Sequence, residues 1–131
     1  MKRNLVLVIV GLVSLTVHSL DETIVFGAPS GPPWIGQFAI SVLLVALTAL
    51  HPRLGRWRLV PAALLVLLGV FVIGTGWIAH VRPLLERGPG PADASGLLFL
   101  LGGVLLLASG ALLQQRAMTS WRAVARPWSA G

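Results

Sequence analysis

Hydrophobic residues in this chain fall into four long runs, separated by short segments rich in glycine, proline and polar residues. The runs cover residues 5–20, 34–50, 59–80 and 96–113, and none of them contains Lys, Arg, Asp or Glu. Each is close to the roughly 20 residues that an α-helix needs to cross about 30 Å of hydrocarbon. Because backbone groups in lipid must bond to one another, such runs form helices. The pattern predicts an all-α fold, a four-helix antiparallel transmembrane bundle.

The segments between the runs predict where the helices end. Glycine and proline, which terminate helices and form turns, concentrate at residues 27–33, 51–56 and 88–91. Only 11% of the residues are charged and 56% are hydrophobic, whereas soluble proteins carry about 25% charged residues. We therefore expect residues 1–131 to form a single transmembrane domain. The absence of cysteine excludes disulfides and thiolate metal sites.

Charge is distributed unequally between the two predicted sides of the membrane. All four acidic residues fall in the first and third connecting segments and their flanks, with only two of the ten basic residues. The other eight basic residues are Lys2, Arg3, Arg53, Arg56, Arg58, Arg116, Arg122 and Arg126. Lys and Arg accumulate on the cytoplasmic side of membrane proteins, so both termini and the middle loop are predicted to be cytoplasmic. The expected location is the cytoplasmic (plasma) membrane, with several spans and no nucleic-acid partner.

The two ends of the chain allow further interpretations. Residues 116–131 alternate arginine and tryptophan among small residues, which predicts an interfacial cytoplasmic tail on anionic lipid. Residues 1–19 also fit a signal peptide, with Met1-Lys2-Arg3 as its basic start and Val17-His18-Ser19 as a cleavage site. We expect them to be retained as the first span.

Small residues recur at intervals of seven in the last two runs, which predicts close helix packing. The third run carries Ala62, Gly69 and Gly76, and the fourth carries Gly96, Gly103 and Gly110. Lipid tails are as apolar as leucine, so transmembrane helices pack through small residues and polar contacts. The two runs should therefore form an intimate hairpin. The first run has Asn4, Gly11 and His18 at the same interval, and the second has Ser41 and Thr48.

The candidate chemistry lies at the predicted outer end. His18, Asp21 and Glu22 share one helical face by their spacings of three and four, and His80 closes the third run. Two histidines and up to four carboxylates therefore have the opportunity to converge, the others being Glu86 and Asp93. Ionisable residues at membrane depth are candidates for function.

Three interpretations of this cluster remain open. In the first, the carboxylates are solvated and the histidines have a structural role. In the second, histidines and carboxylates bind a divalent metal such as Zn²⁺, and the candidate ligands are His18, Asp21, Glu22, His80, Glu86 and Asp93. The third is an acid/base or ligand site that uses His18, Asp21, Glu22 and His80. A haem between the two histidines is conceivable, but no cofactor other than a divalent metal is expected. His51 belongs to the other end, where it is expected to cap the second helix.

Three short stretches resemble a family of small four-span membrane domains from high-GC actinobacteria, often encoded with or fused to an α/β-hydrolase. They are His18-Ser19-Leu20-Asp21-Glu22, His51-Pro52-Arg53-Leu54 and Asp93-Ala94-Ser95-Gly96-Leu97-Leu98, similar to the H-x-x-D-[D/E], Y-P-R-L and D-x-x-G-L-L patterns of that family. The resemblance implies an outward-facing acidic/histidine cluster and a soluble enzyme partner. This chain departs from the family in lacking a further histidine in the outer loop and a hydrolase domain.

Three functions follow as expectations. The first is an accessory subunit or anchor of a membrane assembly, with a protein partner or a second copy of the chain. A second is a membrane-embedded enzyme, or a binder of lipid or a small molecule, that uses the outer His/carboxylate cluster; the sequence does not decide whether the chain is an enzyme. The last is a metal-binding or transport component. Transport through one protomer lacks support, because the middle of the predicted bundle contains no charge.

Overall fold

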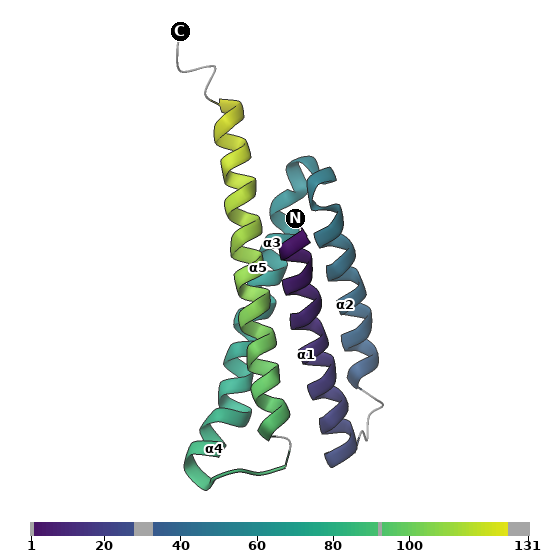
Figure 1. The fold of residues 1–131 in the computed structure, drawn as a ribbon, viewed down its shortest axis with the longest axis vertical. Coiled ribbons are helices and arrows are strands. Elements are labelled where there is room, and N and C mark those ends of the chain that lie inside the picture. The colour runs from purple at the N-terminus through teal and green to yellow at the C-terminus, as the bar shows by residue number, and fades with distance from the viewer. Residues whose placement is uncertain (1, 28–32, 92, 126–131) are drawn as a thin grey trace.

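The computed structural model describes residues 2–27, 33–91 and 93–125. Within them the chain is helical and contains no strand, which confirms the predicted all-α class. Its elements, labelled in Figure 1, are α1 (Lys2–Phe26), α2 (Pro33–Leu50), two 3₁₀ turns η1 (His51–Arg53) and η2 (Gly55–Arg58), α3 (Leu59–Gly76), a π-helical turn η3 (Trp77–Val81), α4 (Arg82–Arg87) and α5 (Asp93–Ala125).

Four helical stretches in the described residues are long and apolar enough to cross a membrane. They are Lys2–Phe26, Ile35–Arg53, Gly55–Arg87 and Asp93–Ser120. Side-chain exposure supports this assignment, because large apolar side chains such as Leu67 and Phe71 are 67% and 64% exposed on the outside. Polar side chains such as Asn4 and Ser109 are fully buried. An apolar exterior around a partly polar interior is typical of a multi-pass membrane protein.

The helices extend beyond the predicted runs. α1 continues six residues past Leu20 to Phe26. Gly27 follows it, with a φ of +79° that suits glycine and an N–H that donates to the Thr23 carbonyl at 3.0 Å. The third helical stretch passes through η3 without interruption and ends at Arg87. Hydropathy identifies only the part of a helix that lies in lipid, so polar turns that prolong it are missed. Most of the first predicted loop, residues 28–32, lies outside the described residues.

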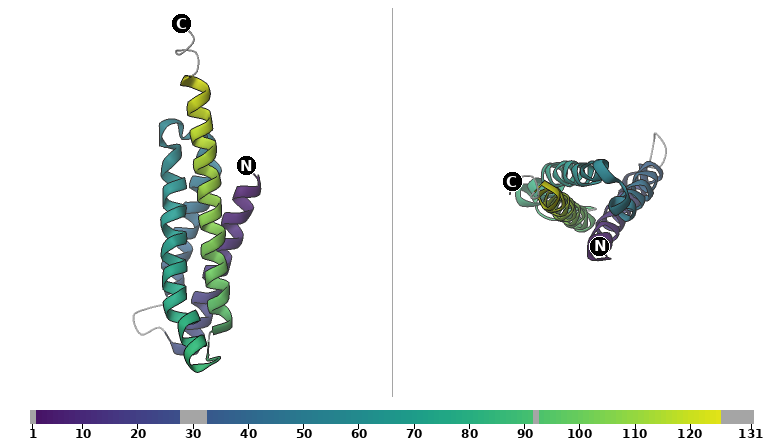
Figure 2. Two further views of the ribbon diagram at one scale, coloured as in Figure 1. Left: turned by 90° about the vertical axis from the view of Figure 1, so that its left-hand side faces the viewer. Right: turned by 90° about the horizontal axis from the view of Figure 1, so that it is seen from above.

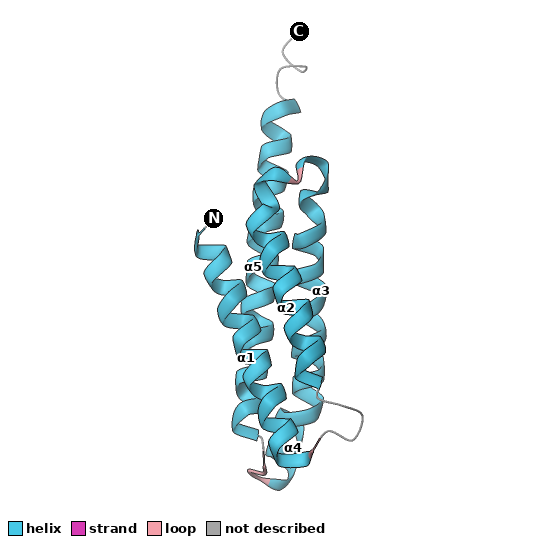
Figure 3. Ribbon diagram, turned by 90° about the vertical axis from the view of Figure 1, so that its right-hand side faces the viewer, coloured by secondary structure: helices cyan, strands magenta, loops and turns pink. Residues whose placement is uncertain are grey.

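α5 is the central helix of the arrangement. It packs along α3 on one side and along α1 on the other, whereas α2 packs mainly against α1 (Figures 2 and 3). The start of α1 and the C-terminal part of α5 lie toward one end of the molecule, and α4 lies at the other (Figure 1). We refer to the second as the α4 end. α5 continues through Ala125 beyond the other helices, so the described part of the predicted tail is helical; its position on lipid stays a prediction.

The predicted glycine stripes do lie in the contact between α3 and α5. A Cβ atom on Gly69 would stand 2.8 Å from the Gly103 carbonyl oxygen, and one on Gly110 would stand 2.8 Å from the Ala62 carbonyl oxygen. At these positions the two backbones approach too closely for any side chain. Contacts pair high numbers on α5 with low numbers on α3, so the two helices run in opposite directions.

α1 presents its seven-residue stripe to α5. Gly11 lies against the Gly102 carbonyl and Leu106, and the Ser109 hydroxyl donates to the Asn4 carbonyl at 3.3 Å. The stripe of α2 is less closely packed. Thr48 is buried and bonds to its own helix, whereas Ser41 borders an apolar groove of about 480 Å³ between α1 and α2.

Candidate metal centre

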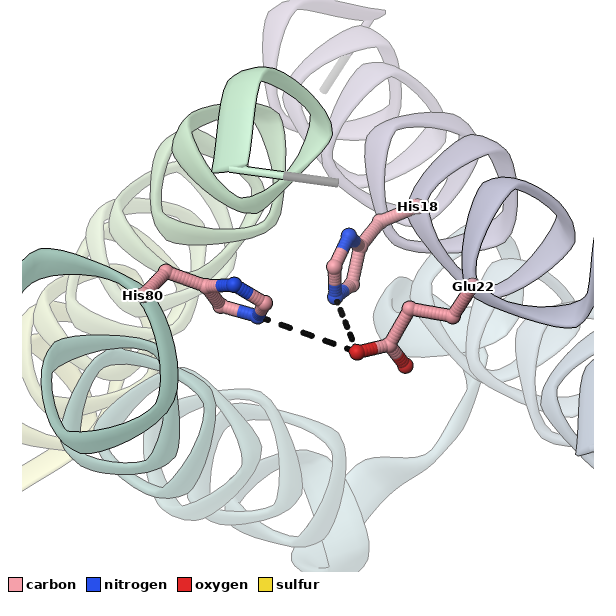
Figure 4. Close-up of side chains that lie close together, drawn as sticks. All are labelled: His18, Glu22 and His80. Atoms are coloured by element: carbon pink, nitrogen blue, oxygen red, sulfur yellow. Dashed lines mark ion pairs between the residues drawn. The ribbon is translucent and has the colours of Figure 1, made fainter. Parts of the chain in front are cut away.

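Three potential metal ligands meet at the α4 end. His18 and Glu22 project from successive turns of α1, and His80 projects from η3 (Figure 4). One ligand atom from each residue lies within 4.8 Å of the other two. The Glu22 Oε1 atom lies 3.4 Å from His18 Nε2 and 4.0 Å from His80 Nε2. These three residues are referred to below as the triad.

The triad is enclosed on the protein side and open on the other. The side chains of His18 and His80 are only 3% and 10% exposed, whereas that of Glu22 is 42% exposed. The two imidazole rings meet edge to face, with their centroids 4.6 Å apart, and the ring of Phe99 packs against His18 at 4.8 Å. The histidines are therefore fixed by packing, while the carboxylate is free to adjust.

A π-helical turn sets the position of His80. The Arg82 N–H donates to the Trp77 carbonyl, five residues earlier, instead of to a carbonyl four residues earlier. Pro83 explains this turn, because proline has no N–H and its ring clashes with the carbonyl four residues before it, that of Ala79. π-helical turns occur often at functional sites, and this one aims His80 at α1 and α5.

Gly96 in the first turn of α5 makes room for the His80 ring. A Cβ atom on this glycine would stand 2.3 Å from His80 Cγ and 2.8 Å from His80 Cβ. No side chain fits there without moving the histidine. The predicted packing glycine is thus also part of the site.

A hydrogen-bonded chain supports His18 from behind. The Ser95 hydroxyl lies 3.0 Å from His18 Nδ1, and it donates a short hydrogen bond to Asp21 Oδ2. Asp21 is therefore joined through Ser95 to Nδ1 of His18, whereas Glu22 faces Nε2, the other ring nitrogen. Sequence reasoning missed Ser95 and Phe99 as part of the site.

The other two candidate carboxylates are held elsewhere. Glu86 Oε1 pairs with Arg82 Nε at 2.7 Å, and both side chains are more than half exposed. Asp93 is buried at the start of α5, where its Oδ2 accepts a hydrogen bond from the Gly90 N–H. Among the described residues, the group that could hold an ion consists of the triad alone. Of the four predicted carboxylates, Glu22 therefore lies beside the two histidines, and Asp21 reaches His18 through Ser95.

The donor set suits a first-row divalent ion. Two imidazoles and a carboxylate with open positions occur in catalytic zinc sites and in non-haem iron sites. Two ligands at about 2.05 Å from a tetrahedral ion are about 3.3 Å apart, close to the 3.4 Å between His18 Nε2 and Glu22 Oε1. An ion would also draw the other pairs together, because Glu22 Oε1 lies 4.0 Å from His80 Nε2 and the three ligand atoms are within 4.8 Å of one another. Charge also matches, because Glu22 and Asp21 together balance a doubly charged cation.

The same geometry bears on the haem interpretation and on His51. A haem with two axial histidines needs the rings on opposite faces of the macrocycle, but the rings of His18 and His80 are in contact. His51 is buried in η1, the turn between α2 and α3, and this turn lies at the opposite end of the molecule from α4 (Figure 1). It follows α2 directly, and its buried Nε2 atom has no hydrogen-bond partner among the described residues.

Comparison with known proteins adds no relationship: no family model, no curated protein and no solved structure matches this chain.

Proposed function

We propose that this chain is a multi-pass protein of the cytoplasmic membrane that binds a divalent transition-metal ion, Zn²⁺ or one of similar chemistry, on the outer side. The observation that carries the proposal is the convergence of the ligand atoms of His18, Glu22 and His80 within 4.8 Å. Two of these residues are buried in a helical membrane protein, where ionisable side chains are rare and mark functional sites.

The unequal charge distribution supports the orientation in this proposal. Eight of the ten basic residues lie in the two terminal segments and in the loop that contains η1 and η2. By the positive-inside rule both termini are cytoplasmic, and the four helices form an antiparallel bundle with the α4 end outside. The exposed side of Glu22 then opens to the extracytoplasmic water, from which an ion can enter.

A divalent ion held by these three ligands would keep at least one coordination position for water or a substrate. Zinc sites with three protein ligands and an open fourth position are catalytic, whereas structural zinc sites have four protein ligands. We therefore favour a metal-binding component over a purely structural role, and the same residues serve a membrane-embedded enzyme if the bound ion activates water.

Elemental analysis with a native mass spectrum tests the proposal. The protein is extracted gently from its own membrane, and metal content is compared for wild type, His18→Ala, His80→Ala and Glu22→Gln. Glu86→Gln is the matched control, because that carboxylate lies at the same end but outside the triad. We expect one metal per chain in wild type and control, and loss in the three triad variants. Equal zinc affinity in wild type and His80→Ala would overturn the proposal.

An accessory subunit or anchor is the second candidate, and the position of α2 favours it. Only 22% of the most apolar part of this helix is buried, compared with 33–39% for the other three. α2 therefore leaves most of its apolar surface open in the plane of the membrane, where another helix or a second copy has room to pack. The native mass spectrum tests this role directly. A partner polypeptide or a homo-oligomer supports it, and a lone chain in several mild detergents argues against it.

A further inference from the structure

The chain of hydrogen bonds behind His18 determines where that imidazole carries its proton. His18 Nδ1 lies 3.0 Å from the Ser95 hydroxyl oxygen, which in turn donates to Asp21 Oδ2. A hydroxyl has a single hydrogen and an ionised carboxylate only accepts. Since Ser95 gives its hydrogen to Asp21, its oxygen accepts from His18, and Nδ1 must carry a proton.

Burial of both residues keeps water from replacing this hydrogen bond, so the proton stays on Nδ1. Ser95 is 8% exposed and His18 is 3% exposed, so water has little access with which to replace either partner. A buried polar atom without a partner costs about 1–3 kcal/mol. The opposite arrangement, with a lone pair on Nδ1 facing an oxygen whose hydrogen points to Asp21, sets two acceptors against each other.

We propose that Asp21 and Ser95 are positioning residues that hold His18 as the Nδ1-protonated form and thereby make Nε2 its metal-binding atom. The part about metal rests on the proposed function, whereas the part about the proton does not. With the proton held on Nδ1 by the Ser95 oxygen, the free lone pair of the neutral ring is on Nε2. Nε2 is also the atom that faces Glu22, at 3.4 Å.

This arrangement prevents a hydrogen bond from His18 Nε2 to Glu22 within the triad when the ring is neutral. Without Ser95, a neutral His18 is free to place its one proton on Nε2 and donate it to Glu22. That bond occupies both a nitrogen ligand and a carboxylate ligand. Carboxylate partners behind a metal-binding histidine also increase its basicity, and their loss typically weakens metal binding by about 10–100-fold.

Nitrogen NMR of the metal-free protein, labelled with ¹⁵N-histidine in lipid nanodiscs, tests the assignment of the proton. At a pH where the His18 ring is neutral, we expect its proton on Nδ1. In Ser95→Ala we expect the neutral ring to carry its proton on Nε2, while the His80 signals keep their pattern. A neutral His18 with its proton on Nε2 in wild type would overturn the inference.

Zinc affinity of the same samples tests the consequence for metal binding. Ser95→Ala should weaken zinc binding by about 10–100-fold, and Ser95→Thr, which keeps the hydroxyl, should restore most of it. If Ser95→Ala does not fold, Asp21→Asn serves instead, because an amide can donate to Ser95 and reverse the chain of bonds. Unchanged affinity and an unchanged proton position in these variants would refute the positioning role. If no sample binds zinc but Nδ1 is protonated in wild type, the proposed function fails and the proton assignment stands.

Discussion

Gly96→Ala is the smallest change that should remove His80 from the triad. The added methyl group would stand 2.3 Å from His80 Cγ and 2.8 Å from His80 Cβ. Carbon atoms in contact prefer about 3.5–4.0 Å, so the histidine must retreat by more than about 1 Å. Because Cβ as well as the ring is too close, rotation of the ring alone does not relieve the clash. Metal sites tolerate deviations of only about 0.2 Å in ligand distance.

The expected loss of zinc affinity follows from this displacement. Losing a ligand should cost at least as much as losing an outer partner, so we expect a decrease of about 100-fold or more. That corresponds to about 2.7 kcal/mol of binding free energy. Competition between the protein and a chromophoric zinc chelator, in detergent or nanodiscs, measures the change. The added methyl group also overpacks the helix contact, at a cost of about 1–3 kcal/mol in the free energy of unfolding.

Two control substitutions separate the site from the packing. Gly103→Ala introduces a similar clash in the same helix pair, 2.8 Å from Val72 Cγ1, but touches no ligand. Gly74→Ala lies on the same helix as His80 and meets nothing within 4 Å. Both should keep wild-type zinc affinity. The reasoning is refuted if Gly96→Ala binds zinc as tightly as Gly103→Ala does.

Three further substitutions test the remaining packing arguments. Gly103→Leu forces a large side chain against Val72, so the melting temperature in detergent should fall; an unchanged value would contradict the close contact of α3 and α5. Asp93→Ala removes the acceptor of the Gly90 N–H and should cost about 1 kcal/mol of stability while leaving zinc affinity unchanged; reduced affinity would mean that Asp93 belongs to the metal site after all. Asn4→Leu removes two buried polar atoms that have no hydrogen-bond partner among the described residues, and should stabilise the protein by about 1 kcal/mol. A lower melting temperature would show that Asn4 is bonded to something else.

Hydropathy and glycine spacing predicted the four helices and the surface shared by α3 and α5. Both follow from general rules, since about 20 apolar residues cross a bilayer and small residues permit close approach. Helix ends were less predictable. α1 extends to Phe26 and the third helical stretch to Arg87, because helices continue into water wherever the backbone stays bonded.

The sequence identified the three residues of the triad, but it did not predict the hydrogen bonds and helix contacts that position them. The spacing of four placed His18 and Glu22 on one face, and the order of the spans brought His80 to the same level. What the sequence concealed is the rotation of each helix, which depends on the close approach at Gly96 and on the π-helical turn before Pro83. The signal for that turn was present, since Pro83 interrupts the bonding of an α-helix. Ser95 looked like an ordinary small residue because its role depends on partners 74 and 77 positions away.

The triad also has a consequence for the stability of the whole bundle. α5 separates α1 from α3 along most of their length, and the triad is a place where side chains of the first and third helical stretches meet directly. An ion held by His18, Glu22 and His80 would therefore link α1 to the third helical stretch, two segments that otherwise pack mainly against α5. A ligand that binds only the folded state, at about 100 times its Kd, stabilises it by about 2.7 kcal/mol. Adding zinc to metal-free protein should accordingly raise its melting temperature. Because His80→Ala removes the α3 side of this bridge, zinc should leave its melting temperature unchanged; an equal rise in wild type and variant would mean that zinc acts elsewhere on the chain.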